Sequence, residues 1–215
     1  MQDFLPKLRE HLLPRIQMAL LQEAELLSGP SSVRTVSDTT PFHSSDRNAS
    51  NDVFLKNDCI YHHKLIQFHF TTYDIQCGTD IVNPGTYCCN VMLLDDAEGS
   101  GSVNSSNLHH FLYARVLGGY HINAIYTGPG MRDFEARHFD FLWVRWLEVV
   151  NPGSSGWSTS KLDSVCFPPM NENYSFGFVD PKDVLHSCHI LPAFARGKQQ
   201  KDRVSISCCA KDGAD

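Results

Sequence analysis

The chain lacks the long apolar run and the excess of positive charge that would assign it to a membrane or a nucleic acid. No stretch of its 215 residues approaches the ~20 apolar residues of a membrane span, and no charged segment with a short apolar core opens it. We therefore expect an intracellular protein without membrane contact. With 18 Lys and Arg against 24 Asp and Glu, the net charge of -6 disfavours direct DNA binding, which needs a broad basic surface.

Catalytic motifs are also missing. The G-x-S-x-G turn, Gly-rich phosphate loops, H-E-x-x-H and the kinase signatures do not occur. The acidic pairs, Asp95 with Asp96 and Asp133 with Glu135, fall in turn-like segments where solvated charge is the ordinary explanation. The sequence therefore predicts a chain that is not an enzyme and needs no cofactor.

Eight cysteines invite a metal interpretation, yet no C-x₂-C pair occurs. Structural zinc sites usually contain such short-spaced pairs, because two ligands from one turn preorganise half of the tetrahedron. Without a secretory signal, free and partly buried thiols are the simpler expectation. One alternative stays open, a zinc-stabilised module or small metal-dependent enzyme, whose ligands would be Cys166, His186, Cys188 and His189.

Two aromatic-rich runs joined by Gly-Pro-Gly are the clearest features that the chain does have. In residues 112–126 apolar side chains occupy alternate positions, the period of a half-buried strand. In residues 138–149 both parities are apolar, which predicts a strand covered on both faces. Shorter strand patterns from about residue 59 to residue 194 complete a mainly β module. Five to seven antiparallel strands suit a small, partly open barrel, SH3-like or BAH-like.

The N-terminal segment carries the one convincing helical pattern, with leucines and Ile16 at three- and four-residue steps. Pro14 is expected to kink this helix or divide it. The domain boundaries that we predict are a helical segment at 1–27, a flexible linker at 28–54, a β-barrel domain at 55–197 with a disordered loop at 95–108, and a disordered tail at 198–215.

Aromatic side chains are the remaining candidates for binding. Ring faces attract a cation, so an exposed cage would recognise a methylated lysine. Trp143 and Trp146 alternate along one strand, and at least one of them should therefore be buried. The candidate cage residues are Tyr73, Tyr126, Trp143, Trp146 and Trp157.

Several phrases of the chain resemble a known family. They are FLPKLREHLLPRI at 4–16, KNDCIYHHKLIQFHFTTYDI at 56–75, FLYARVLGGYHINAIYTGPG at 111–130, HFDFLWVRWLEV at 138–149 and FGFVDPKDVLHSCHILPAFARGK at 176–198. Together they resemble the C-terminal region of transposon-encoded proteins of mushroom-forming fungi, the Plavaka group of the CACTA superfamily. The resemblance spans nearly the whole chain. In that family the nuclease lies upstream, so the resemblance brings no catalytic residues.

The resemblance implies an accessory domain of a mobile-element protein, nuclear, with the transposase or chromatin as its protein partner. At the positions of Cys59, Gln67 and Cys77, the family that the chain resembles looks to have arginine or another polar residue. The family also continues past the SISCC phrase, whereas this chain stops at Asp215. Both departures are expected of an ageing, truncated copy.

Overall fold

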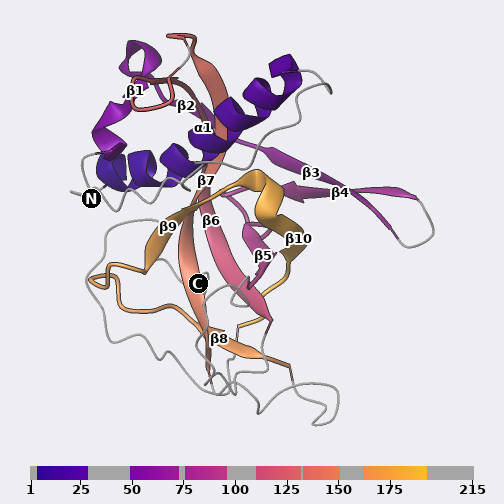
Figure 1. Ribbon diagram of the computed structural model, residues 1–215. Helices are drawn as coiled ribbons and strands as arrows, with labels where there is room; N and C mark the ends of the chain where they lie inside the picture. The colour runs from indigo at the N-terminus through magenta and orange to yellow at the C-terminus, as the bar shows by residue number, and fades with distance from the viewer. Residues whose placement is uncertain are drawn as a thin grey trace, which may run out of the picture. The chain divides into compact units, whose positions relative to one another are not determined.

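The structure, a computed structural model, describes residues 4–28, 49–72, 76–95, 110–131, 133–150 and 162–192 (Figure 1). In this part of the chain no helix combines the length and the apolar character of a membrane span. In chain order the elements are α1 (Phe4–Ser28), η1 (Ala49–Asp52), β1 (Val53–Leu55), η2 (Lys56–Asp58), β2 (Tyr61–His63), β3 (Ile66–Thr71), β4 (Cys77–Val82), β5 (Asn90–Leu94), β6 (Phe111–Tyr126), β7 (Arg137–Val150), β8 (Ser164–Cys166), β9 (Phe176–Val179), η4 (Pro181–Asp183) and β10 (Val184–Cys188).

This arrangement confirms a mainly β chain with an N-terminal helix. The main sheet has the strand order β10-β5-β6-β7-β8, with β1 and β2 also paired to β6 and β9 paired to β7. Because β10 and β8 stand at its two ends, the sheet is open. The finer likeness to SH3 or BAH modules stays a prediction.

The strands belong to two compact units, each made of two stretches of chain. The first unit comprises Met1–Tyr61 and His121–Phe139, and the second comprises His62–Tyr120 and Asp140–Asp215. The boundaries fall inside β2, β6 and β7, so each of these strands contributes residues to both units.

In the first unit, α1 buries one stripe of side chains. Pro14 does not divide the helix, which runs unbroken from Phe4 to Ser28. Both Pro14 and Glu10 face solvent, so water can hydrate the Glu10 carbonyl that Pro14 leaves without an amide partner. The buried residues recur at the predicted four-residue steps: Leu8, Leu12, Ile16 and Leu20.

The predicted Gly-Pro-Gly turn follows β6 in the same unit. The Met131 N–H donates to the Gly128 carbonyl at 3.1 Å, and Gly130 has a φ of 82°. Proline at the second position and a left-handed glycine at the third are what a type II turn requires. The Tyr126 hydroxyl donates to the Pro129 carbonyl at 3.1 Å, which holds the turn against the end of β6.

Arg137, at the start of β7, joins the helix to the strand within the first unit. Its guanidinium donates to the two Glu23 carboxylate oxygens at 2.9 and 2.7 Å and to the two Asp133 oxygens at 3.1 and 3.2 Å. The Arg137 side chain is 13% exposed. Hydrogen bonding to Glu23, and after it to Asp133, outweighs burial and raises the pKa of Arg137 above its usual range.

The second unit contains a core of aliphatic side chains from five strands. In β6 the predicted alternation holds around Ala114 and Val116, which are buried between half-buried neighbours. In β7 both parities are buried over 141–145 apart from Trp143, which confirms the strand covered on both faces. The core comprises Val82, Val91, Leu93, Ala114, Val116, Leu142, Val144 and Val179.

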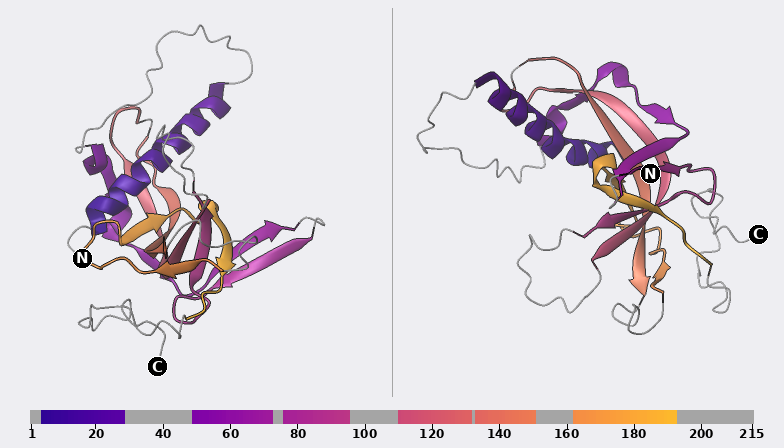
Figure 2. Two further views of the ribbon diagram at one scale, coloured as in Figure 1. Left: turned by 90° about the horizontal axis from the view of Figure 1, so that it is seen from below. Right: turned by 90° about the vertical axis from the view of Figure 1, so that its right-hand side faces the viewer.

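The β3–β4 hairpin forms a separate two-stranded sheet in the second unit and extends from the other strands as an arm (Figures 1 and 2). Its register runs without a shift from Ile66↔Val82 to Thr71↔Cys77. Ile66 and Phe68, on one face, pack against the core. The arm is thus attached at its base through its apolar face.

Part of the predicted linker is ordered. Residues 49–52 form η1, and Val53 is fully buried in β1, where it pairs with Tyr126. The C-terminal end of the linker predicted for 28–54 is therefore wrong, because residues 49–54 belong to η1 and β1. A short strand between polar residues shows little periodicity in the sequence. Residues 29–48, most of the predicted loop at 95–108, and the predicted tail lie outside the described residues.

Candidate binding cleft

The second unit has a cleft of about 260 Å³ between the start of β3 and the middle of β6 and β7. Its lining mixes apolar surface with a few polar groups, the composition typical of binding sites. All of its residues belong to this one unit. The lining residues are His63, Leu65, Ile66, Gln67, Phe68, Gly119, Tyr120, Asp140, Phe141, Leu142 and Pro181.

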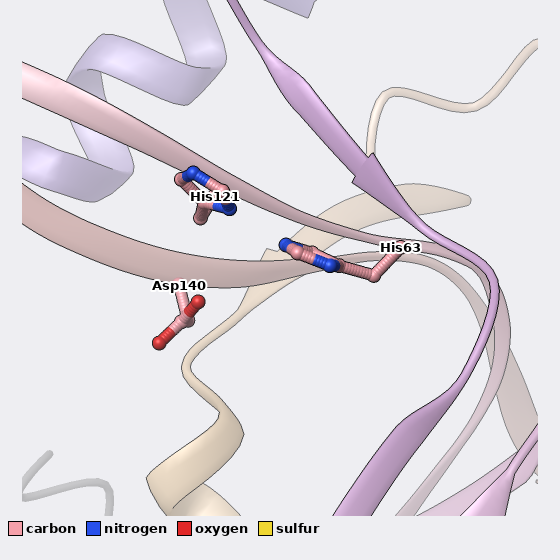
Figure 3. Close-up of side chains that lie close together, drawn as sticks. All are labelled: His63, His121 and Asp140. Carbon is pink, nitrogen blue, oxygen red and sulfur yellow. The ribbon is translucent and has the colours of Figure 1, made fainter.

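His63 and Asp140 place an imidazole beside a carboxylate at the cleft. A ring nitrogen of His63 and a carboxylate oxygen of Asp140 lie within 4.8 Å of each other, and both side chains are exposed (Figure 3). His121, also drawn in Figure 3, belongs to the first unit, where its ring stacks on that of Tyr61 at 4.5 Å. Two ligands from the second unit do not make a zinc site, which takes three or four from the protein.

A chain of aromatic rings supports the cleft. The Tyr120 ring stacks on the Phe141 ring with centroids 5.5 Å apart, and the Phe141 ring meets Phe178 edge to face at 5.5 Å. His62 lies on the Tyr120 ring at 5.1 Å. Ring pairs in these geometries hold one another in place, so this wall is preorganised.

Gly119 allows β3 to cross β6 at close range. A Cβ placed on Gly119 would lie 2.6 Å from Ile66 Cγ1 and 2.8 Å from its Cδ1. Non-bonded carbon atoms do not approach so closely. Ile66 can therefore pack directly against the backbone of β6 only because residue 119 has no side chain.

We expect Gly119→Ala to lower the free energy of unfolding by about 1 to 3 kcal/mol, because the added methyl group overpacks the contact with Ile66. Urea unfolding followed by tryptophan fluorescence measures the change. Gly85→Ala is the matched control, since its Cβ would meet only Asn83 Oδ1 at 3.4 Å. Equal stability of the two variants would contradict the role given to Gly119.

Asp80 on β4 fixes the arm to β10. Its Oδ2 accepts a hydrogen bond from the Ser187 N–H at 2.8 Å and lies 3.2 Å from His186 Nδ1. The edge of the Phe70 ring meets the His186 ring with centroids 4.4 Å apart. The arm is therefore attached through both of its strands, by Ile66 on β3 and by Asp80 on β4.

The ladder between β3 and β4 determines which backbone groups of β3 are used. The Thr72 N–H donates to the Gln76 carbonyl at 2.8 Å, one step beyond the Thr71↔Cys77 pair. Hydrogen-bonded and non-hydrogen-bonded pairs alternate in an antiparallel ladder. Residues of the same parity as Thr72 thus direct their N–H and C=O groups toward β4.

The remaining residues of β3 direct their backbone groups away from β4. These residues are Gln67, His69 and Thr71, and all three side chains are exposed. Among the described strands only β4 pairs with β3. The outer edge of β3 is therefore open, and it borders the cleft at Gln67.

The residues predicted for an aromatic cage lie in different surroundings. Tyr126, in the first unit, is 2% exposed and offers no ring face to a ligand. Trp143 stacks at 5.7 Å on a phenylalanine of β9, and Trp146 packs against the core of the second unit. Tyr73 and Trp157 lie outside the described residues, so the cage as a whole stays a prediction.

The structure does not bring the four predicted metal ligands together. His186 contacts Asp80, and the His189 ring meets that of Tyr87 at 6.1 Å. Within the described ranges, no three of Cys166, His186, Cys188 and His189 have ligand atoms close enough to share an ion. The two histidines contact Asp80 and Tyr87 instead, and Cys166 lies on a different strand from Cys188.

Partial desolvation raises the thiol pKa of two of the cysteines, the half-buried Cys188 and the more exposed Cys166. Desolvation, and after it the neighbouring Cys89, raises the pKa of the Cys188 thiol to about 11. Burial, followed by the charge of Glu148, raises the pKa of Cys166. Both a metal ligand and a nucleophile need the thiolate, which these surroundings disfavour.

We expect Cys188 to react with iodoacetamide about 100-fold more slowly at pH 7.5 than the exposed Cys59 and Cys77. The pKa of about 11 removes most of its thiolate, and burial limits access. Peptide mass spectrometry over a time course measures each rate in one sample. Urea-unfolded protein is the control, in which the rates should converge. Equal rates in the folded protein would contradict the burial of Cys188.

Comparisons with protein-family models, with curated proteins and with solved structures gave no match.

Sequence reasoning missed the residues of the cleft. His63 and Asp140 come from β2 and β7, and no motif spacing connects them. One signal was available: Asp140 is the one acidic residue in the apolar run from His138 to Leu147. A charge in such a run indicates a site where the strand is not fully covered.

Proposed function

We propose that this chain is a non-catalytic interaction module that binds an extended segment of a partner protein in the cleft of its second unit. The observation that carries the proposal is the open edge of β3 beside a cleft of mixed apolar and polar lining. Sheet edges of this kind bind peptides as additional strands, while adjacent pockets select side chains.

The setting of the module follows from the resemblance to Plavaka-type proteins. An accessory domain of a mobile-element protein would meet either its transposase or a chromatin protein, in the nucleus. The net charge of -6 favours a protein partner over DNA in that setting. An SH3-like or BAH-like character agrees with a role in recognition.

Panning a phage-displayed library of random peptides against the purified chain tests the proposal. Leu65→Glu places a charge in the cleft at a side chain that is already 59% exposed, so the fold should be kept. Leu191→Glu is the matched control, since Leu191 is 66% exposed in the same unit and does not line the cleft.

The selected peptides should bind the wild type and Leu191→Glu alike and bind Leu65→Glu at least about tenfold more weakly. Peptides that bind all three proteins equally would place recognition elsewhere. Failure to select any peptide, together with duplex-DNA binding that weakens steeply with salt, would replace the proposal with direct DNA contact.

A further inference from the structure

We infer that the bound segment pairs with the outer edge of β3 as an extra strand and directs a lysine or arginine side chain toward Asp140. This inference rests on the function proposed above and specifies the chemistry of the partner. It concerns only residues of the second unit.

The outer edge of β3 has none of the usual protection against pairing. Proteins shield an open edge with a charged side chain, a proline or a bulge. Gln67, His69 and Thr71, whose backbone groups face outward, include no lysine, acidic residue or proline, and the register with β4 is regular from Ile66 to Thr71. Three N–H and three C=O groups are thus offered to a partner strand.

The edge is also held in place before any partner arrives. The base of the arm is fixed by the contact of Ile66 over Gly119 and by the hydrogen bond from the Ser187 N–H to Asp80. A binding surface that is already ordered loses less conformational entropy on association. A regular, attached strand edge is therefore a better template than a free hairpin.

Charge selects the side chain of the partner. Asp140, which lies beside His63, is the one carboxylate among the lining residues that the structure describes. A basic side chain thus finds a carboxylate, whereas an acidic one would meet Asp140 with like charge.

Fluorescence anisotropy with a synthetic probe tests the inference. The probe is a labelled peptide of about six residues that alternates threonine and valine, with one central lysine. Matched probes carry glutamate or glutamine in place of the lysine. We expect the lysine probe to bind about tenfold or more tightly than the glutamate probe at low salt, and Asp140→Asn to remove most of that difference.

Backbone pairing is tested on both partners. Methylating the peptide nitrogens of one parity of the probe should abolish binding, while methylating the other parity should have little effect, because alternate N–H groups face β3. Gln67→Pro removes an outward N–H of β3 and leaves the ladder to β4 intact. It should weaken binding about tenfold or more, whereas Ile81→Pro, on the far edge of β4, should not.

Three results would overturn the inference. If library-selected peptides depend on Leu65 but show no parity effect of methylation, the cleft binds protein without strand pairing, and the proposed function stands alone. If glutamate and lysine probes bind equally, Asp140 does not select the partner. If the wild type is a dimer in sedimentation analysis and Gln67→Pro is a monomer, the occupant of the edge is a second copy of the chain.

Discussion

Replacing Arg145 with alanine should lower the free energy of unfolding of the second unit by about 3 to 5 kcal/mol. Arg145 is 2% exposed and is the largest fully buried side chain among the described residues. Its guanidinium lies 4.2 Å from the Phe167 ring centroid and 5.9 Å from that of Phe176. Alanine removes the stem that fills this space and the charge that the rings attract.

Urea unfolding of the Arg145 variants, followed by fluorescence, measures the effect. Trp143 and Trp146, the tryptophans that the structure describes, belong to the second unit, so their signal reports on that unit. Arg145→Met, which keeps most of the volume and removes the charge, should lose less than the alanine variant. Arg115→Met is the control, because the Arg115 guanidinium also lies over the Phe167 ring, 4.7 Å from its centroid. The Arg115 side chain is less buried than that of Arg145, so its loss should cost less. An Arg145→Ala protein with the wild-type midpoint would contradict this account.

Arg137→Ala should destabilise the first unit by about 2 to 3 kcal/mol, because it removes four charge-assisted hydrogen bonds and a side chain that is mostly buried. The four hydrogen bonds from Arg137 to Glu23 and Asp133 all lie between 2.7 and 3.2 Å. At 13% exposure the guanidinium is poorly screened by salt. We expect the amides of α1 to exchange with solvent faster in this variant, since Glu23 lies on the helix.

Hydrogen exchange with mass spectrometry measures the α1 effect directly. Glu23→Gln is the milder control, because it keeps an acceptor and removes one charge. A double-mutant cycle of Glu23→Gln with Arg137→Met isolates the coupling between the two side chains. Unchanged exchange over residues 4–28 in Arg137→Ala would mean that the apolar stripe alone holds the helix.

The periodicity of apolar residues predicted the long helix and the long strands, because an element that buries one face must repeat its apolar residues at the period of that element. The four-residue steps of α1 and the alternation in β6 are both patterns that a single buried face requires. Pro14 does not divide the helix, because an interior proline costs less where the freed carbonyl reaches water. The sequence alone does not show which side of the helix faces solvent. The strand β1 at Val53 was not predicted, because three residues are too few to show the two-residue periodicity of a strand.

The candidate cleft was beyond sequence reasoning for a different reason. Its lining comes from β2, β3, β6, β7 and η4, and no local pattern specifies which strands cross. The sequence shows Asp140 as a charge in an apolar run. It does not show that His63, from another strand, lies close to Asp140 in space. In the same way, Arg145 lies in a strand predicted to be covered on both faces, yet only the structure shows that Phe167 is the ring beneath its guanidinium.

The composition of the two units limits how the chain can be dissected or rearranged. Residues 1–61 lack the partner stretch 121–139, and residues 62–120 lack the stretch that starts at 140. A cut after residue 61 leaves the second unit whole and divides the first, and a cut after residue 139 leaves the first unit whole and divides the second. A gene rearrangement with one breakpoint therefore cannot separate two whole units. Two intact units can consequently be obtained as separate polypeptides only by reordering the chain, not by dividing it once.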